Sequence, residues 1–135
     1  MELRSSILRL AYRWGPVLFW MAGISYFSSR SYPLGPLSRS EHSDVINRVA
    51  HFAEYAGLAA LLHRAAAEGG REHRASWVSL VVSLAYAIFD ELHQKFVPGR
   101  GFELADVGYD LAGAIVALGL IWVWSASPRR RHVRR

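Results

Sequence analysis

Apolar residues fall into four blocks along the chain, and charged or polar residues separate them. The blocks cover roughly residues 14–29, 45–63, 76–89 and 104–124. Three of them contain stretches without any charged residue, at residues 14–27, 77–89 and 111–124. The helices of a soluble bundle carry charge along a full outer face. These stretches are apolar on all sides, which favours helices that lie in lipid.

A soluble four-helix bundle is the alternative, because the blocks are short for membrane spans. Their uncharged lengths are 16, 9, 15 and 18 residues, and about 20 are needed to cross a hydrocarbon core of about 30 Å. However, the charges of the last three blocks gather at one end of each block. We therefore predict an all-α fold: one integral membrane four-helix bundle over residues 1–135, with spans at about 14–29, 45–63, 76–93 and 104–124.

Proline, glycine and serine residues predict where these helices begin and end. We expect Pro16 in the first turn of the first span, where proline is tolerated, with residues 1–13 as a short interfacial lead-in. Ser43 and Asp44 make a good start for the second helix. Pro98 and Gly99 should stop the third helix, because proline disfavours helical geometry in the residue before it and glycine allows a turn.

The distribution of lysine and arginine predicts the orientation. If all four blocks span, eleven of the 16 basic residues lie on the side of the two termini and five on the other. The positive-inside rule then places both termini in the cytoplasm of a bacterial-type inner membrane. The net charge of +5 follows from this topology and from contact with anionic lipid. A nucleic-acid partner is not needed to explain it.

The second block carries a polar stripe along one face. Asp44, Arg48, His51 and Tyr55 recur at i, i+4, i+7 and i+11, a spacing that brings side chains to one side of a helix. Glu54 lies one turn from His51 and could belong to the same face. A single histidine in a helix is usually a packing residue, but an acid, a guanidinium, an imidazole and a phenol in one stripe point to a site.

The third and fourth blocks carry further polar groups. Asp90, Glu91 and Gln94 end the third block, Arg100 follows the predicted stop, and Asp106 and Asp110 open the fourth block. Gly113 and Ala117 continue that last stripe, and small residues let a neighbouring helix approach closely.

The depths of these residues predict that they converge. His51, Asp90 and Asp110 each lie 13 or 14 residues from a residue suited to the cytoplasmic interface. At 1.5 Å per residue, all three sit about 20 Å above the inner boundary. A polar pocket open to the outside, at the depth of lipid phosphates, is the expected result. Polar groups that are costly to keep in a membrane usually serve a function.

The pattern formed by several of these residues resembles that of the VanZ-like membrane protein family. They are Ser43, Asp44, His51 to Tyr55, the segment Asp-Glu-x-x-Gln-x-x-x-Pro-x-Arg at residues 90–100, Asp106, and Asp110 followed by Gly113. The resemblance runs from about residue 14 to residue 117. It implies a small four-helix membrane protein, a namesake associated with teicoplanin resistance, and kinship with membrane enzymes that hydrolyse or exchange lipid head groups. Asp110 stands where many relatives have asparagine.

This cluster suits the head group of a membrane lipid or of a lipid-linked cell-wall precursor. Arg48 and Arg100 could clamp a phosphate, and His51 could act as general base or nucleophile, oriented by Asp90 or Glu91. The residues expected to be catalytic are His51, Asp90, Glu91 and Asp106. Those expected to bind substrate are Asp44, Arg48, Tyr55, Gln94, Arg100 and Asp110.

The sequence leaves the cofactor and the class of function open. Oxygen ligands suit Mg²⁺ or Ca²⁺, but no ligand spacing is diagnostic, so the metal is unknown. The absence of cysteine excludes thiol chemistry and disulfides. If the protein is an enzyme, we expect a lipid head-group hydrolase or transferase. The main alternative is a non-catalytic binding or structural protein that affects glycopeptide susceptibility. A proton-coupled transporter fits less well, because the inner half of the bundle is apolar.

Overall fold

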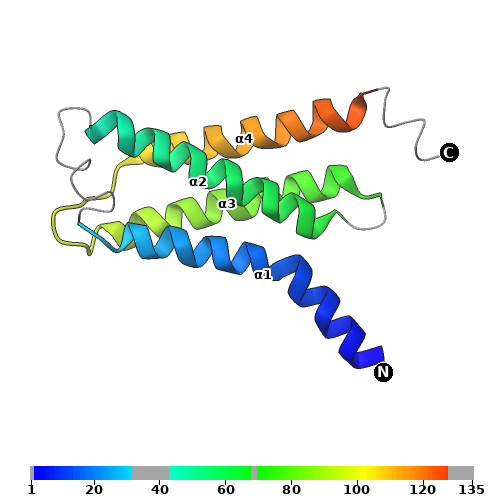
Figure 1. Cartoon of the computed structure of the whole chain (residues 1–135). Helices are drawn as coiled ribbons and strands as arrows, with labels where there is room; N and C mark the ends of the chain where they lie inside the picture. The colour runs from blue at the N-terminus through cyan, green and yellow to red at the C-terminus, as the bar shows by residue number, and fades with distance from the viewer. Residues whose placement is uncertain (1, 32–42, 68–69, 128–135) are drawn as a thin grey trace.

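The computed structural model describes residues 2–31, 43–67 and 70–127, and these ranges contain four α-helices and no strand. The helices are α1 (Glu2–Ser28), α2 (Ser43–Ala66), α3 (Glu72–Gln94) and α4 (Leu104–Ala126). In Figure 1 the start of α1, the end of α4, the end of α2 and the start of α3 lie at one end of the bundle. The predicted elements are therefore all present, and α2 begins at Ser43 as expected.

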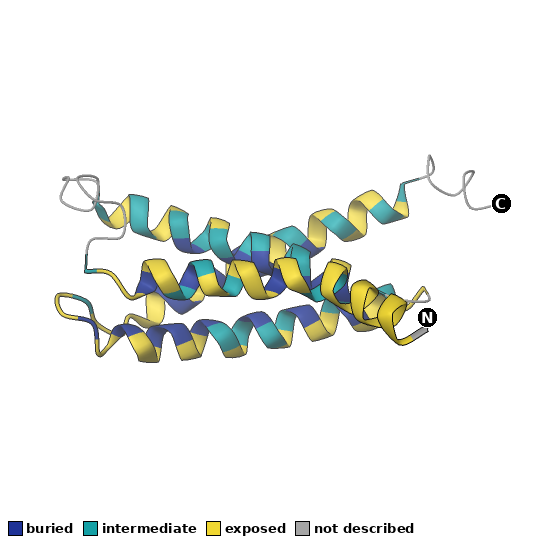
Figure 2. Ribbon diagram, turned by 60° about the horizontal axis from the view of Figure 1, so that its bottom comes forward, coloured by how far each residue is buried: buried dark blue, intermediate teal, exposed yellow. Residues whose placement is uncertain are grey.

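Helix α2 is the centre of the bundle. It packs against the other three helices, most extensively against α4. Its side chains Tyr55, Leu58 and Leu62 are almost completely buried. Figure 2 shows the buried positions on the sides of the helices that face one another, while exposed positions cover the outside.

Large apolar side chains on the outer surface of the bundle indicate a lipid environment. On α4, the exposed residues include Leu120, Trp122 and Trp124, each at least 60% exposed. Helices α3 and α4 are both long and apolar enough to cross a membrane. The four spans and the cytoplasmic position of the termini stay predictions.

Helix α1 is longer than predicted, and Pro16 lies in its interior instead of its first turn. Figure 1 shows α1 bending away from the bundle in its N-terminal part. Proline has no N–H for the carbonyl four residues earlier and clashes with it, which kinks a helix. That carbonyl belongs to Tyr12, and it accepts a hydrogen bond from Arg64 Nη2 at 3.1 Å. An arginine from α2 thus replaces the bond that the proline removes.

Helices α2 and α4 approach each other closely at Gly113. A Cβ atom at this position would lie 2.1 Å from the carbonyl oxygen of Phe52 and 3.2 Å from the backbone nitrogen of Ala56. The close approach expected at this small residue is therefore present. It brings the N-terminal halves of α2 and α4 together.

The connection between α3 and α4 folds over the end of the bundle. Helix α3 ends at Gln94, four residues before Pro98, and Gly99 has a φ of 79°, in the left-handed region that glycine adopts readily. The side chain of Val97 is buried, and its carbonyl accepts a hydrogen bond from Arg100 N at 3.1 Å. This turn holds Arg100 next to α2.

Candidate functional site

A polar cleft lies between the start of α2 and the connection from α3 to α4. Its volume is about 290 Å³. Acidic, basic and amide side chains line it, and they include Asp44, Asn47, Arg48, Gln94, Arg100, Glu103 and Asp106. A smaller cavity of about 80 Å³ lies beside it and is lined in part by His51, Glu54 and Arg100.

His51 lies at the base of this region between two carboxylates of α4. Its Nδ1 is 3.0 Å from Asp110 Oδ1, within hydrogen-bond distance, and its Nε2 is 3.7 Å from Asp106 Oδ2. Asp110 is completely buried, and His51 and Asp106 nearly so. Asp106 and Asp110 reach the same imidazole because they lie one turn apart on α4. The carboxylate bonded to His51 is thus Asp110, where we had expected Asp90 or Glu91.

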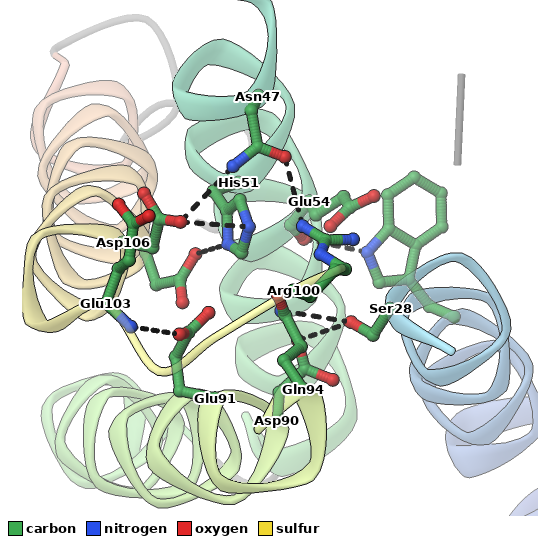
Figure 3. A network of polar contacts seen from close by, with 12 residues as sticks. Ser28, Asn47, His51, Glu54, Asp90, Glu91, Gln94, Arg100, Glu103 and Asp106 are labelled. Atoms are coloured by element: carbon green, nitrogen blue, oxygen red, sulfur yellow. Dashed lines mark hydrogen bonds and ion pairs between the residues drawn. The ribbon is translucent and has the colours of Figure 1, made fainter. Parts of the chain in front are cut away.

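Asn47 links Asp106 to Arg100. Its amide nitrogen donates to Asp106 Oδ2 at 3.2 Å, and its amide oxygen accepts from Arg100 Nη2 at 3.2 Å. Figure 3 shows these two bonds above His51, with Arg100 reaching in from the α3–α4 connection. An amide can serve both groups because it has both a donor and an acceptor. The guanidinium is thereby held at the cleft, one side chain away from the His51 cluster.

Glu91 joins the same cluster from α3. One carboxylate oxygen, Oε2, accepts a hydrogen bond from the backbone nitrogen of Glu103 at 3.0 Å. The other oxygen, Oε1, is buried and has no hydrogen-bond partner among the described residues, and the same holds for Asp110 Oδ2. Buried polar atoms without partners are uncommon and call for an explanation. Both lie in this cluster.

Asp90 belongs to a separate hydrogen-bonded group between α3 and α1. Its Oδ2 accepts from Ser28 Oγ at 2.6 Å and from Gln94 Nε2 at 3.1 Å. All three side chains are buried. Figure 3 shows this group on the side of the site that faces α1, apart from the bonds of His51. Its contacts are those of a structural link between two helices.

The remaining predicted site residues lie at the edge of the site or beneath it. Asp44 and Arg48 are exposed and line the cleft, and the Arg48 guanidinium lies 5.5 Å from the centre of the Tyr109 ring. Tyr55 is fully buried among core residues. Its hydroxyl has no hydrogen-bond partner in the described part of the chain.

Sequence reasoning missed Asn47 and Ser28. Asn47 lies four residues before His51, so it falls on the helix face that carries the predicted polar stripe. That stripe was identified from its acidic, basic and phenolic side chains, and Asn47 is none of these. Ser28 lies at the end of α1, where several serines occur together and nothing in the pattern distinguishes one of them.

Three side chains of the cluster are arranged so that they could hold a metal ion. One ligand atom from each of His51, Glu91 and Asp106 lies within 4.8 Å of the other two. The three residues come from α2, α3 and α4, and all are buried. Their meeting point therefore depends on the packing of these three helices.

The fold and the site define a small all-helical membrane protein with a buried polar cluster below a cleft. Comparison with known families agrees with this class. The model of the VanZ/LLP1 family matches residues 6–125, and the chain belongs to this family. The resemblance drawn from the sequence is therefore confirmed. No curated protein matches the chain, and no solved structure matches it.

Proposed function

We propose that this protein hydrolyses or exchanges the phosphate-linked head group of a membrane lipid or of a lipid-linked cell-wall precursor. The proposal includes four spans, cytoplasmic termini and a cleft that opens to the outer leaflet. The observation that carries it is the position of the cleft. Arg100 lines both the cleft and the adjoining cavity, and the cavity also borders His51.

Arg100 is suited to bind the phosphate. Its guanidinium offers several donors in a planar fork that matches phosphate oxygens, and one of them is already fixed by Asn47. Arg48, on the rim, adds a second positive charge. The acidic side chains of Asp44 and Glu103 in the same cleft would favour a head group that also carries a positive group or hydroxyls.

The His51 cluster supports the chemical step. In hydrolysis, water attacks the phosphorus, the phosphorus–oxygen bond to the leaving group breaks, and a proton passes from the water to the leaving oxygen. In exchange, a hydroxyl of an acceptor replaces the water. Such a reaction needs a buried group that accepts and returns a proton. His51 lines the cavity beside the cleft. Its imidazole is held by Asp110, and Glu91 and Asp106 flank it.

The alternative of a purely structural cluster explains part of the site. The Asp90, Ser28 and Gln94 group is hydrogen-bonded as a brace would be. One oxygen each of Glu91 and Asp110 has no hydrogen-bond partner among the described residues. This does not fit a brace, because a buried acceptor without a partner destabilises the fold. These oxygens favour a site that binds something.

A reconstitution experiment tests the proposal. The purified protein is placed in vesicles made from extracted bacterial lipids, and lipid composition is followed by mass spectrometry. We expect one lipid class to lose or exchange its head group, and His51→Ala to stop this. His73→Ala is the matched control, because His73 is exposed and lies at the opposite end of α3 from Glu91. Unchanged lipids with the wild type, or an unchanged rate with His51→Ala, would contradict the proposal.

A further inference from the structure

The buried cluster has the composition and shape of a metal site. We propose that His51, Glu91 and Asp106 bind one divalent transition-metal ion, Mn²⁺ or Zn²⁺. One ligand atom from each residue lies within 4.8 Å of the others, so an ion about 2.0–2.2 Å from each donor could contact all three after small side-chain movements. Three protein ligands, with further positions left open, is the pattern of catalytic sites.

The hydrogen bond to Asp110 prepares His51 as a ligand. A metal-bound histidine almost always donates its other ring N–H to a carboxylate or carbonyl, which fixes its tautomer and orientation. His51 Nδ1 lies 3.0 Å from Asp110 Oδ1. The other nitrogen, Nε2, faces Asp106 at 3.7 Å. With the proton on Nδ1, the lone pair of Nε2 points to the place where the ion would bind.

The two carboxylate ligands are held in the same way. Asn47 donates to Asp106 Oδ2, and the backbone nitrogen of Glu103 donates to Glu91 Oε2. Glu91 has no exposed surface, yet its Oε1 has no hydrogen-bond partner in the described ranges. Figure 3 shows the two Glu91 oxygens, one bonded to Glu103 and the other directed towards the region of His51. A cation at this point would give that oxygen a partner.

The charge of the cluster also calls for a cation. Asp106 and Asp110 are both paired with His51, and a ligand atom of Glu91 lies within 4.8 Å of the same imidazole. Like charges at close range in a buried site destabilise the ionised state, and a divalent ion offsets them. Because one donor is an imidazole nitrogen, the set suits Mn²⁺ or Zn²⁺ better than the Mg²⁺ or Ca²⁺ expected from oxygen ligands alone.

The ion would change the part that His51 plays. As a ligand through Nε2, His51 would not accept the proton itself, and a water on an open position of the ion would supply the nucleophile, because a bound metal lowers the pKa of its water. This consequence rests on the proposed function. The metal site itself does not, and its test needs no lipid substrate.

Calorimetry on the detergent-purified, chelator-treated protein measures the site directly, with any polyhistidine tag removed. Titration with MnCl₂ or ZnCl₂ should give one saturable site, with weaker binding of MgCl₂ and CaCl₂. His51→Gln, Glu91→Gln and Asp106→Asn should each abolish it, and Asp110→Asn should weaken affinity about 10–100-fold. The control Asp44→Asn should leave affinity unchanged, because Asp44 is an exposed acid of the same cleft that lies outside the cluster.

Failure to bind either ion, or wild-type affinity in any of the three ligand variants, would overturn the assignment. If the ligand variants do not fold, the assignment is tested on the wild type alone. Pulsed electron paramagnetic resonance of the Mn²⁺-loaded wild type should then show coupling to an imidazole nitrogen. Bound Mn²⁺ without nitrogen coupling would overturn it too. If the wild type binds the metal but converts no lipid, this result contradicts only the proposed function.

Discussion

We expect the close contact between α2 and α4 at Gly113 to affect both the stability of the bundle and the geometry of the site. Replacing Gly113 by alanine would place a methyl group 2.1 Å from the Phe52 carbonyl oxygen. The obstructing atoms belong to the α2 backbone, so the helices must separate to make room. Overpacking of this kind costs about 1–3 kcal/mol. Gly113 lies one turn from Asp110, so the separation should also weaken the Asp110 bond to His51.

Gly119→Ala, on the same helix, is the matched control. In the described part of the chain, no atom beyond its chain neighbours and the adjacent backbone of α4 lies within 4 Å of a Cβ at Gly119. Both substitutions gain the same helix propensity, about 1 kcal/mol, and this contribution cancels in the comparison. Unfolding in detergent micelles should therefore show Gly113→Ala less stable than Gly119→Ala by about 1–3 kcal/mol. Lipid conversion should fall only in Gly113→Ala. Equal stability of the two variants would refute the close α2–α4 approach.

Three further predictions concern other parts of the molecule. Ser28→Ala removes the 2.6 Å bond to Asp90 and should lower stability by about 1–3 kcal/mol, measured by the same unfolding assay; an unchanged midpoint would count against the brace. In a chain without cysteine, Gly101→Cys should react with an impermeant thiol reagent on intact cells and Gly70→Cys should not; the reverse pattern would overturn the orientation. Arg100→Lys keeps the charge but loses the planar fork, so it should reduce the rate of lipid conversion; a wild-type rate would contradict the phosphate-clamp role.

The sequence predicted the helices well because each carries a strong local signal. The apolar runs, the Ser43 start and the Pro98–Gly99 stop are all read from neighbouring residues. The first helix was the exception. Its N-terminal part alternates apolar and basic residues, and proline normally marks a helix start. Only the tertiary contact from Arg64 to the Tyr12 carbonyl shows how the helix continues through Pro16.

The site was predicted in composition but not in pairing. Depth along the helices brought His51 and Asp110 to one level, and the structure places them in contact. The depth of a residue along its helix does not determine the direction in which its side chain points around the helix axis. Asp90 and Glu91 are adjacent in sequence, yet they point to different neighbours, Asp90 to α1 and Glu91 to the start of α4. The same limit hid Asn47, whose importance comes from its two partners.

The proposed function requires that the cleft bind the phosphate of a lipid head group through Arg100. Native mass spectrometry of the purified protein measures this binding. The control is Arg30→Ala, because the Arg30 guanidinium lies over the Tyr26 ring and Arg30 is not among the residues that line the cleft. We predict that a phosphate-containing lipid stays bound to the wild type and to Arg30→Ala but is lost from Arg100→Ala. Equal lipid occupancy in Arg100→Ala and the wild type would contradict the claim.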